Sequence, residues 1–127
     1  PTERYPFIHS VVVTRKGEVW ATDRQENKII VLDRNLKKLR EIQEPVLTSG
    51  LFVDAQGGIW LSAGMDGMIA KLDDNGKITG WIGKKGPATD PNPNAIGEAH
   101  YLVVTPDQKT IYIADSVNAR VHVLRRK

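Results

Sequence analysis

The sequence predicts an all-β fold, in which three consecutive blades of a β-propeller form about half of a ring. Residues 17–20 (Gly-Glu-Val-Trp) recur as residues 57–60 (Gly-Gly-Ile-Trp), and residues 9–13 resemble residues 100–104. Short apolar runs alternate with turns rich in glycine, asparagine and aspartate. A repeat of about 40 residues built from short strands is typical of a propeller blade. Such repeats place their innermost strands around a central channel.

Each repeat alternates strand-like runs with turn residues, so four strands are expected in the first repeat, four in the second and three in the third. They cover residues 9–14, 18–23, 28–33, 39–42, 50–54, 58–62, 68–73, 77–82, 101–105, 110–115 and 120–124. The blades therefore span about residues 8–43, 47–83 and 99–125, and the third lacks its outer strand. Residues 84–98, rich in proline and glycine, are expected to form an inter-blade loop.

Burial can also be predicted from the repeats. Trp20, Trp60 and Tyr112 fall at equivalent places on the second strands, so we expect all three to pack between blades. The inner strands at residues 11–13 and 102–104 are apolar at consecutive positions. Such continuity is typical of a strand that is covered on both faces.

Three blades are too few to close a propeller, which needs about four to eight. We therefore expect a ring of about six blades, completed by a second copy in a homodimer or by a complementary propeller half. Residues 1–7 of a partner are one candidate to pair with the open edge of the third blade. Closure would also cover the apolar flanks that a half-ring exposes.

Composition limits the partners. No apolar run approaches the roughly 18 residues of a membrane span, so none is expected. The chain has no cysteine, which excludes disulfides and cysteine-ligated zinc. Its net charge is +3, with the excess gathered near the end at Arg120, Arg125, Arg126 and Lys127. Because no basic stripe is interleaved with aromatic residues, we interpret this as a solvated terminus, and nucleic acid is not an expected partner.

Longer motifs resemble the NHL-repeat propellers. The first repeat carries the pattern in residues 9–13, 17–23 (Gly-Glu-Val-Trp-Ala-Thr-Asp) and 27–33 (Asn-Lys-Ile-Ile-Val-Leu-Asp). Residues 81–87 leading to His100 look like the family's passage into a new blade, and residues 111–121 look like its closing segment. The resemblance implies a six-bladed ring, of which this chain would be about the C-terminal half. The family includes enzymes, sensors and scaffolds, so fold does not fix function.

The candidate channel residues are His9, Ser49 and His100, which occupy the same position at the start of the three inner strands. Blade symmetry predicts that they lie at the same mouth, where they could contact a small-molecule or peptide ligand. A simpler interpretation is that each histidine bonds to the backbone of a neighbouring blade. His122 lies within a third strand, away from the axis, and is expected to be structural.

The pattern also resembles the peptidyl-α-hydroxyglycine α-amidating lyases. That resemblance implies zinc in the channel, held by histidines from alternate inner strands, which here are His9 and His100. Zinc favours imidazole ligands and keeps an open position in catalytic sites. The third histidine would have to come from other blades.

Residues 106–116 are similar to the gluconolactonase/senescence-marker propellers. This similarity implies that Asp115 binds a divalent metal, although His100 stands where that family has an asparagine ligand. Asp23 fills the same repeat position, which favours a structural turn cap for both aspartates. Three functions therefore remain open: a ligand- or partner-binding scaffold, which we favour, a zinc-dependent lyase, and a metal-dependent lactonase-like hydrolase.

Overall fold

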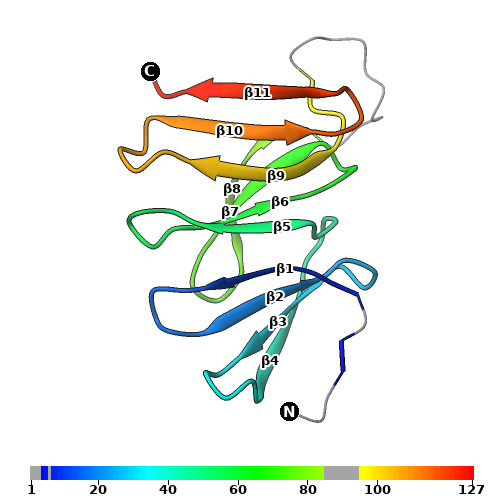
Figure 1. Cartoon of the computed structure of the whole chain (residues 1–127), viewed down its shortest axis with the longest axis vertical. Helices are drawn as coiled ribbons and strands as arrows, with labels where there is room; N and C mark the ends of the chain where they lie inside the picture. Colours follow the sequence, from blue (N-terminus) through cyan, green and yellow to red (C-terminus); the bar gives the residue numbers. More distant parts are fainter. Residues whose placement is uncertain (1–3, 6, 85–94) are drawn as a thin grey trace.

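The computed structural model describes residues 4–5, 7–84 and 95–127, and confirms the all-β fold as three antiparallel sheets side by side (Figure 1). The first sheet contains β1 (Ile8–Val13), β2 (Val19–Asp23), β3 (Lys28–Leu32) and β4 (Lys38–Gln43). The second contains β5 (Gly50–Val53), β6 (Ile59–Ser62), β7 (Met68–Leu72) and β8 (Ile78–Gly83). The third contains β9 (Ala99–Val104), β10 (Thr110–Asp115) and β11 (Arg120–Arg125). Of the predicted loop at residues 84–98, residues 85–94 lie outside the described residues.

Strands follow one another within each sheet in chain order, so each sheet is a blade made of successive hairpins. Aspartates cap these hairpins. Asp33 accepts bonds from the backbone N–H groups of Asn35 and Lys37 (2.8 and 2.9 Å). In the second blade, Asp73 receives the same pair of bonds from the turn that follows it. An aspartate that satisfies the N–H groups of its own turn stabilises a tight reversal.

Two apolar clusters fill the spaces between blades. Between the first and second blades, Trp20, Ile29 and Val31 pack against Leu51 and Leu61, and all five are fully buried. A second cluster joins the second and third blades, with members Ile69, Ala99, Leu102, Val104 and Ile113. Alternate residues of each strand point to the same side, so one face of each sheet supplies each cluster.

The three equivalent aromatics share one register but differ in burial. Trp20 pairs with Val12, Trp60 with Phe52, and Tyr112 with Val103. Trp20 is fully buried, Trp60 is partly buried, and Tyr112 is 40% exposed. The expectation that all three pack between blades is therefore wrong for Tyr112, because the described chain supplies no sheet beyond the third.

The inner strands show the same end effect. Val11 and Val13 in β1 are each 62% exposed, and Val103 in β9 is 38% exposed. Leu102 and Val104, on the opposite face of β9, are buried against the second blade. The prediction of cover on both faces is thus not met at either end of the arc, since each end blade has a neighbour on one side.

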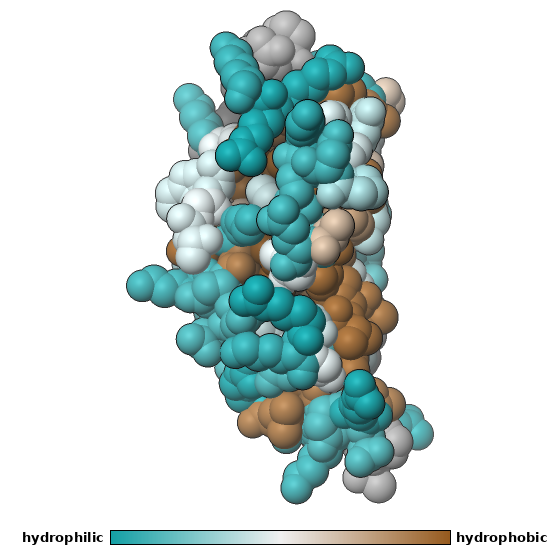
Figure 2. Space-filling view, turned by 90° about the vertical axis from the view of Figure 1, so that its left-hand side faces the viewer, coloured by the Kyte–Doolittle hydropathy of each residue, from teal (hydrophilic) through white to brown (hydrophobic). Residues whose placement is uncertain are grey.

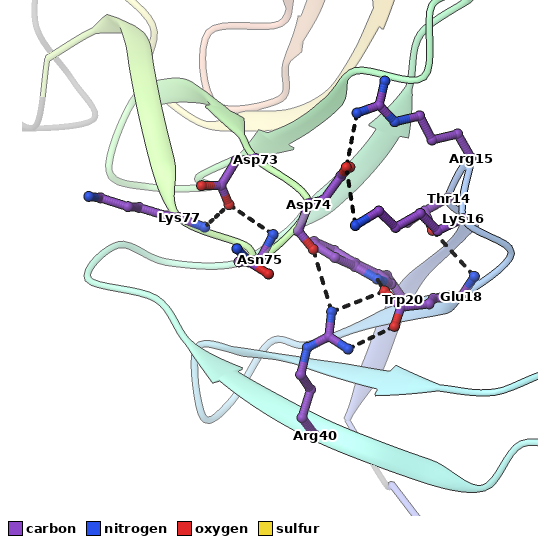
Figure 3. A network of polar contacts seen from close by, with 10 residues as sticks. All are labelled: Thr14, Arg15, Lys16, Glu18, Trp20, Arg40, Asp73, Asp74, Asn75 and Lys77. Atoms are coloured by element: carbon purple, nitrogen blue, oxygen red, sulfur yellow. Dashed lines mark hydrogen bonds and ion pairs between the residues drawn. The ribbon is translucent and has the colours of Figure 1, made fainter.

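A polar clamp in the first blade reaches the second blade through Asp74, which lies in the turn between β7 and β8 (Figure 3). The Arg40 guanidinium donates to both Glu18 carboxylate oxygens (2.7 and 3.0 Å), and the Trp20 indole donates to the same carboxylate (3.3 Å). Arg15 donates to the Asp74 carboxylate of the second blade (2.9 Å). The Arg40 bond lowers the pKa of Glu18 and keeps it ionised. Within the described residues, no helix is long and apolar enough to cross a membrane.

Candidate functional site

The first strand of each blade forms the inner border of the arc, where β1 contacts β5 and β5 contacts β9 (Figure 1). His9 and His100 both lie at interruptions of strand pairing. In β1 the register slips between Ile8 and Ser10, and in β10 it slips between Ala114 and Asp115, opposite His100. A β-bulge leaves one residue unpaired and redirects its side chain. His9 and His100 are therefore the unpaired residues of β1 and β9, at equivalent positions of the first and third blades.

The structure brings His9 and His100 together. Their ring centroids lie 5.2 Å apart, with the planes at 74°, so the rings meet edge to face. His9 belongs to the first blade and His100 to the third. The contact therefore joins two blades that are separated in the sheet order by the second blade. His9 is exposed, and the His100 side chain is 43% exposed. Both rings are partly open to solvent, whereas the Nδ1 atom of His100 is buried and has no hydrogen-bond partner among the described residues.

Glu98 and Arg24 complete the charged surroundings of the histidine pair. Glu98 Oε1 lies 3.7 Å from His100 Nδ1 and 3.3 Å from the Arg24 guanidinium. Its other oxygen accepts a short bond from the Ser116 hydroxyl (2.6 Å). Glu98 thus links the first and third blades at the mouth of the arc and places a carboxylate beside the imidazoles.

Electrostatics favour a neutral His9. Although His9 is exposed, the partial loss of water around its ring lowers its pKa most, and the Arg24 and His100 charges lower it further, against an opposing effect of Glu98. A neutral imidazole presents one nitrogen as an acceptor or metal ligand and the other as a donor. His9 is therefore available for binding near neutral pH.

A hollow of about 370 Å³ opens beside the two rings, lined by His9, Ser10, Gly50, His100 and Tyr101. Gly50 is essential to its shape. A Cβ at this position would lie 2.7 Å from the Tyr101 ring and 2.8 Å from the Ser62 hydroxyl. Glycine therefore lets β5 approach β9 closely, below the mouth.

Ser49 does not bring its side chain to this hollow. It is buried, and its hydroxyl donates to the His100 carbonyl (3.2 Å). Its own carbonyl accepts a bond from the Thr22 hydroxyl (2.9 Å). Through these two bonds Ser49 of the second blade is linked to the first and third blades. Its hydroxyl bonds to the backbone of His100 and not to the imidazole.

Asp115 lies in a different, enclosed environment. Its carboxylate accepts bonds from the backbone N–H groups of Gly97, Glu98 and Asn118, from the Asn118 amide and from His122 Nε2 (2.9 Å). Burial opposes its ionisation, but these bonds outweigh it and hold its pKa well below the usual range. Asp23 likewise accepts from the turn N–H groups of Gln25 and Glu26. This arrangement favours a structural role for Asp115, Asp23 and His122.

The histidine pair offers part of the donor set that a metal ion needs. In the part of the chain that the structure describes, no group of three or more histidine, cysteine, aspartate or glutamate side chains could hold a metal. Two imidazoles whose centroids are 5.2 Å apart could serve as two ligands of one ion. The set therefore fits a zinc site in part, and further ligands would have to come from elsewhere.

Sequence reasoning missed Glu98 and Arg24 as members of the site. Glu98 stands two residues before His100, a spacing that places both side chains on one side of an extended segment. That spacing was a usable signal. Arg24 carries no such signal, because it follows β2 in the first blade and meets Glu98 only through the way the three blades pack around the mouth.

The sequence matches no protein-family model and no curated protein. Solved structures do match in fold. Virginiamycin B lyase from Staphylococcus aureus aligns with a TM-score of 0.64 and 18% identity, over 98% of this chain and 43% of its own. Kuenenia stuttgartiensis hydrazine synthase aligns with a TM-score of 0.72 and 16% identity, over 98% of this chain and 34% of that chain.

A putative 6-phosphogluconolactonase from Bacteroides uniformis aligns with a TM-score of 0.69 and 17% identity, over 94% of this chain and 37% of its own. This chain therefore spans less than half the length of the solved structures that it matches. At these identities the likeness shows the fold alone. The three sheets correspond to blades of a propeller-like fold.

Proposed function

We propose that this chain is an NHL-type propeller half that acts as a scaffold and binds a small-molecule or peptide ligand at the mouth formed by its inner strands. The observation that carries this proposal is the contact between His9 and His100, 5.2 Å apart, beside the Glu98–Arg24 ion pair. His9 and His100 line one solvent-open hollow, and the Glu98–Arg24 ion pair places an anion and a cation beside His100. Convergent polar groups in a concave site are typical of ligand recognition.

Triglycine is a suitable probe, because it carries a carboxylate for Arg24, an ammonium for Glu98 and peptide groups for the imidazoles. Titration should shift the ring-proton NMR resonances of His9 and His100 and leave those of His122 unchanged. Arg24→Ala should weaken the response, and Lys37→Ala, an exposed change in a distant turn, should not. Binding that persists in the His9→Ala/His100→Ala double variant, or no response from either ring, would refute the axial site.

The proposal includes completion of the ring by a second copy. The end faces of the arc expose large apolar side chains: Val11 and Val13 at 62% on one, and Val121 at 64% and Tyr112 at 40% on the other. Contiguous exposed apolar surface favours association. Sedimentation of the wild type should give twice the 14.1-kDa chain mass. The Val121→Glu variant should sediment with the mass of a single chain. A wild-type chain that stays single would leave a complementary half, rather than a second copy, as the partner.

A zinc-dependent lyase is the second candidate, favoured by the same two imidazoles and by the lowered pKa of His9. Bound zinc would supply a Lewis acid and an activated water, while Glu98, close to His100 Nδ1, would orient that ring. Zinc titration followed by calorimetry should show binding that is lost in both His9→Ala and His100→Ala. His122→Gln serves as the control, since His122 is bonded to Asp115 instead. Unchanged zinc affinity in the two alanine variants would exclude the metal site without affecting the triglycine result.

A further inference from the structure

A groove between the second and third blades, far from the histidine pair, lies beside the open edge of β11. It has a volume of about 400 Å³, and its apolar lining includes Trp60, Ile82 and Leu124. β11 is the outermost strand of the third sheet, whereas the first and second sheets carry a fourth strand at that position. The groove therefore lies where a fourth strand would pack, next to backbone groups of β11 that no described strand pairs.

At the other blade boundary the fourth strands are present, and a hollow of about 430 Å³ opens beside them, lined in part by Ile42 and Ile78. There the fourth strands β4 and β8 contribute Ile42 and Ile78, which pack against the cluster between the first two blades. At the second boundary, Ile82 of β8 has no such cover and is 38% exposed. Ile82 therefore lacks the cover that a neighbouring fourth strand gives to Ile42 at the first boundary.

The residue that follows the last leucine of β11 differs from those that lead into the fourth strand of the other two blades. Leu32, Leu72 and Leu124 are equivalent, because each pairs with the first or second residue of the strand before it. Asp33 and Asp73 follow the first two leucines and cap the turn into the fourth strand. Arg125 follows Leu124, the third of these leucines. Its side chain has no carboxylate that could accept bonds from the N–H groups of a following turn.

The rim of the groove is basic. Four cations line it: Lys71, Lys109, Arg125 and Arg126. In the described part of the chain none of them is within 4 Å of a carboxylate, and no acidic residue lines the groove. Lys71 instead lies 5.1 Å from the centre of the Trp60 ring, whose indole N–H is bonded to Asp54. Figure 2 shows long hydrophilic side chains over this side of the molecule, with hydrophobic surface between them.

We propose that this groove binds an extended polypeptide segment that begins with acidic residues and continues with alternating apolar ones. The segment pairs antiparallel with β11, as β4 pairs with β3 and β8 with β7. Its first residues then lie opposite Arg125 and Arg126, where carboxylates meet the cationic rim. The next apolar side chains enter the groove on the side of Leu124 and contact Ile82. Backbone bonds supply affinity in such strand addition, and side-chain pockets supply specificity.

The test uses three acetylated and amidated octapeptides with the full chain. The first is Asp-Glu-Ile-Thr-Val-Thr-Val-Gly, the second begins with Lys-Lys in place of Asp-Glu, and the third has proline in place of both threonines. Proline removes backbone donors and resists a paired strand. Fluorescence anisotropy should show binding of the first peptide, at least tenfold weaker binding of the second, and none of the third. Hydrogen exchange should slow at β11 amides that do not face β10.

Charge reversal in the protein gives the decisive comparison. Arg125→Glu/Arg126→Glu should weaken the acidic peptide at least tenfold and allow the Lys-Lys peptide to bind. Arg34→Glu/Lys37→Glu changes the net charge equally at a distant turn and should leave both affinities unchanged. Equal binding of the proline peptide would mean that the groove takes an anion without strand pairing, and would overturn the proposal. Absence of binding by the acidic peptide, or binding that ignores Arg125 and Arg126, would overturn it as well.

Discussion

The Ser62 hydroxyl donates to the His100 carbonyl at 3.1 Å, across the boundary between the second and third blades. The same oxygen accepts a bond from the Gly50 backbone N–H at 2.8 Å. One fully buried hydroxyl therefore fixes both β5 and the start of β9, directly below the imidazole of His100. Together with the Ser49 hydroxyl, which donates to the same carbonyl, this contact helps to hold the backbone of His100 in place.

Ser62→Ala should destabilise the fold by about 1–3 kcal/mol, because it leaves the Gly50 N–H and the His100 carbonyl with fewer partners in a buried place. Urea denaturation would measure the loss. Thr79→Ala is the control, since the Thr79 hydroxyl is exposed and water can replace its bond to the Lys71 carbonyl. Equal effects of the two changes would contradict the role given to Ser62.

Gly50→Ala should cost about 1–3 kcal/mol by overpacking, since the new methyl group would collide with Tyr101 and Ser62. Gly80 provides a matched control within β8. A Cβ there meets no atom within 4 Å, so Gly80→Ala should be neutral or slightly stabilising. Thermal melts of both variants check the difference. A Gly50→Ala protein as stable as Gly80→Ala would show that β5 and β9 are not held this closely.

Glu44 should make stability depend on pH. Burial, aided by the charge of Asp73, raises its pKa from 4.5 to about 7, and its Oε1 atom has no hydrogen-bond partner. Because the folded state holds the proton more tightly than the unfolded state, stability is greatest below about pH 4.5 for this group and falls as pH rises through 7. The loss should approach about 3 kcal/mol.

Glu44→Gln removes this ionisation and should be more stable than the wild type at pH 8, with little difference at pH 5. Denaturant titrations at both pH values give the comparison. Glu26→Gln, an exposed change, controls for the altered net charge. A Glu44→Gln protein whose pH profile parallels that of the wild type would show that Glu44 titrates normally.

Arg40→Ala should weaken the clamp in Figure 3, because Glu18 loses its two charge-assisted bonds while the Trp20 indole keeps one. The pair is partly exposed, so we expect a loss of about 1 kcal/mol. The loss should shrink at 1 M salt if the bond is mainly electrostatic. Chemical denaturation at low and high salt measures both effects, and Lys37→Ala should show neither.

The architecture was predictable because its causes are local and periodic. Short runs of apolar residues set strands such as Lys28–Leu32, and Asp33 and Asp73 set the turns that follow equivalent strands. The repeat itself then implies that successive sheets are blades. The pairing registers of Trp20, Trp60 and Tyr112 followed from the same repeat.

The sequence by itself determined the strands, the three-sheet order and the equivalence of His9, Ser49 and His100. Only the tertiary structure decided that the two imidazoles touch, that Ser49 turns inward, and that Glu98 and Arg24 join the mouth. It also left Tyr112 exposed while burying Trp20. The physical reason is that a repeat fixes each residue's place within its own sheet, whereas contacts at the mouth depend on bulges and on how neighbouring sheets pack, which no local period encodes.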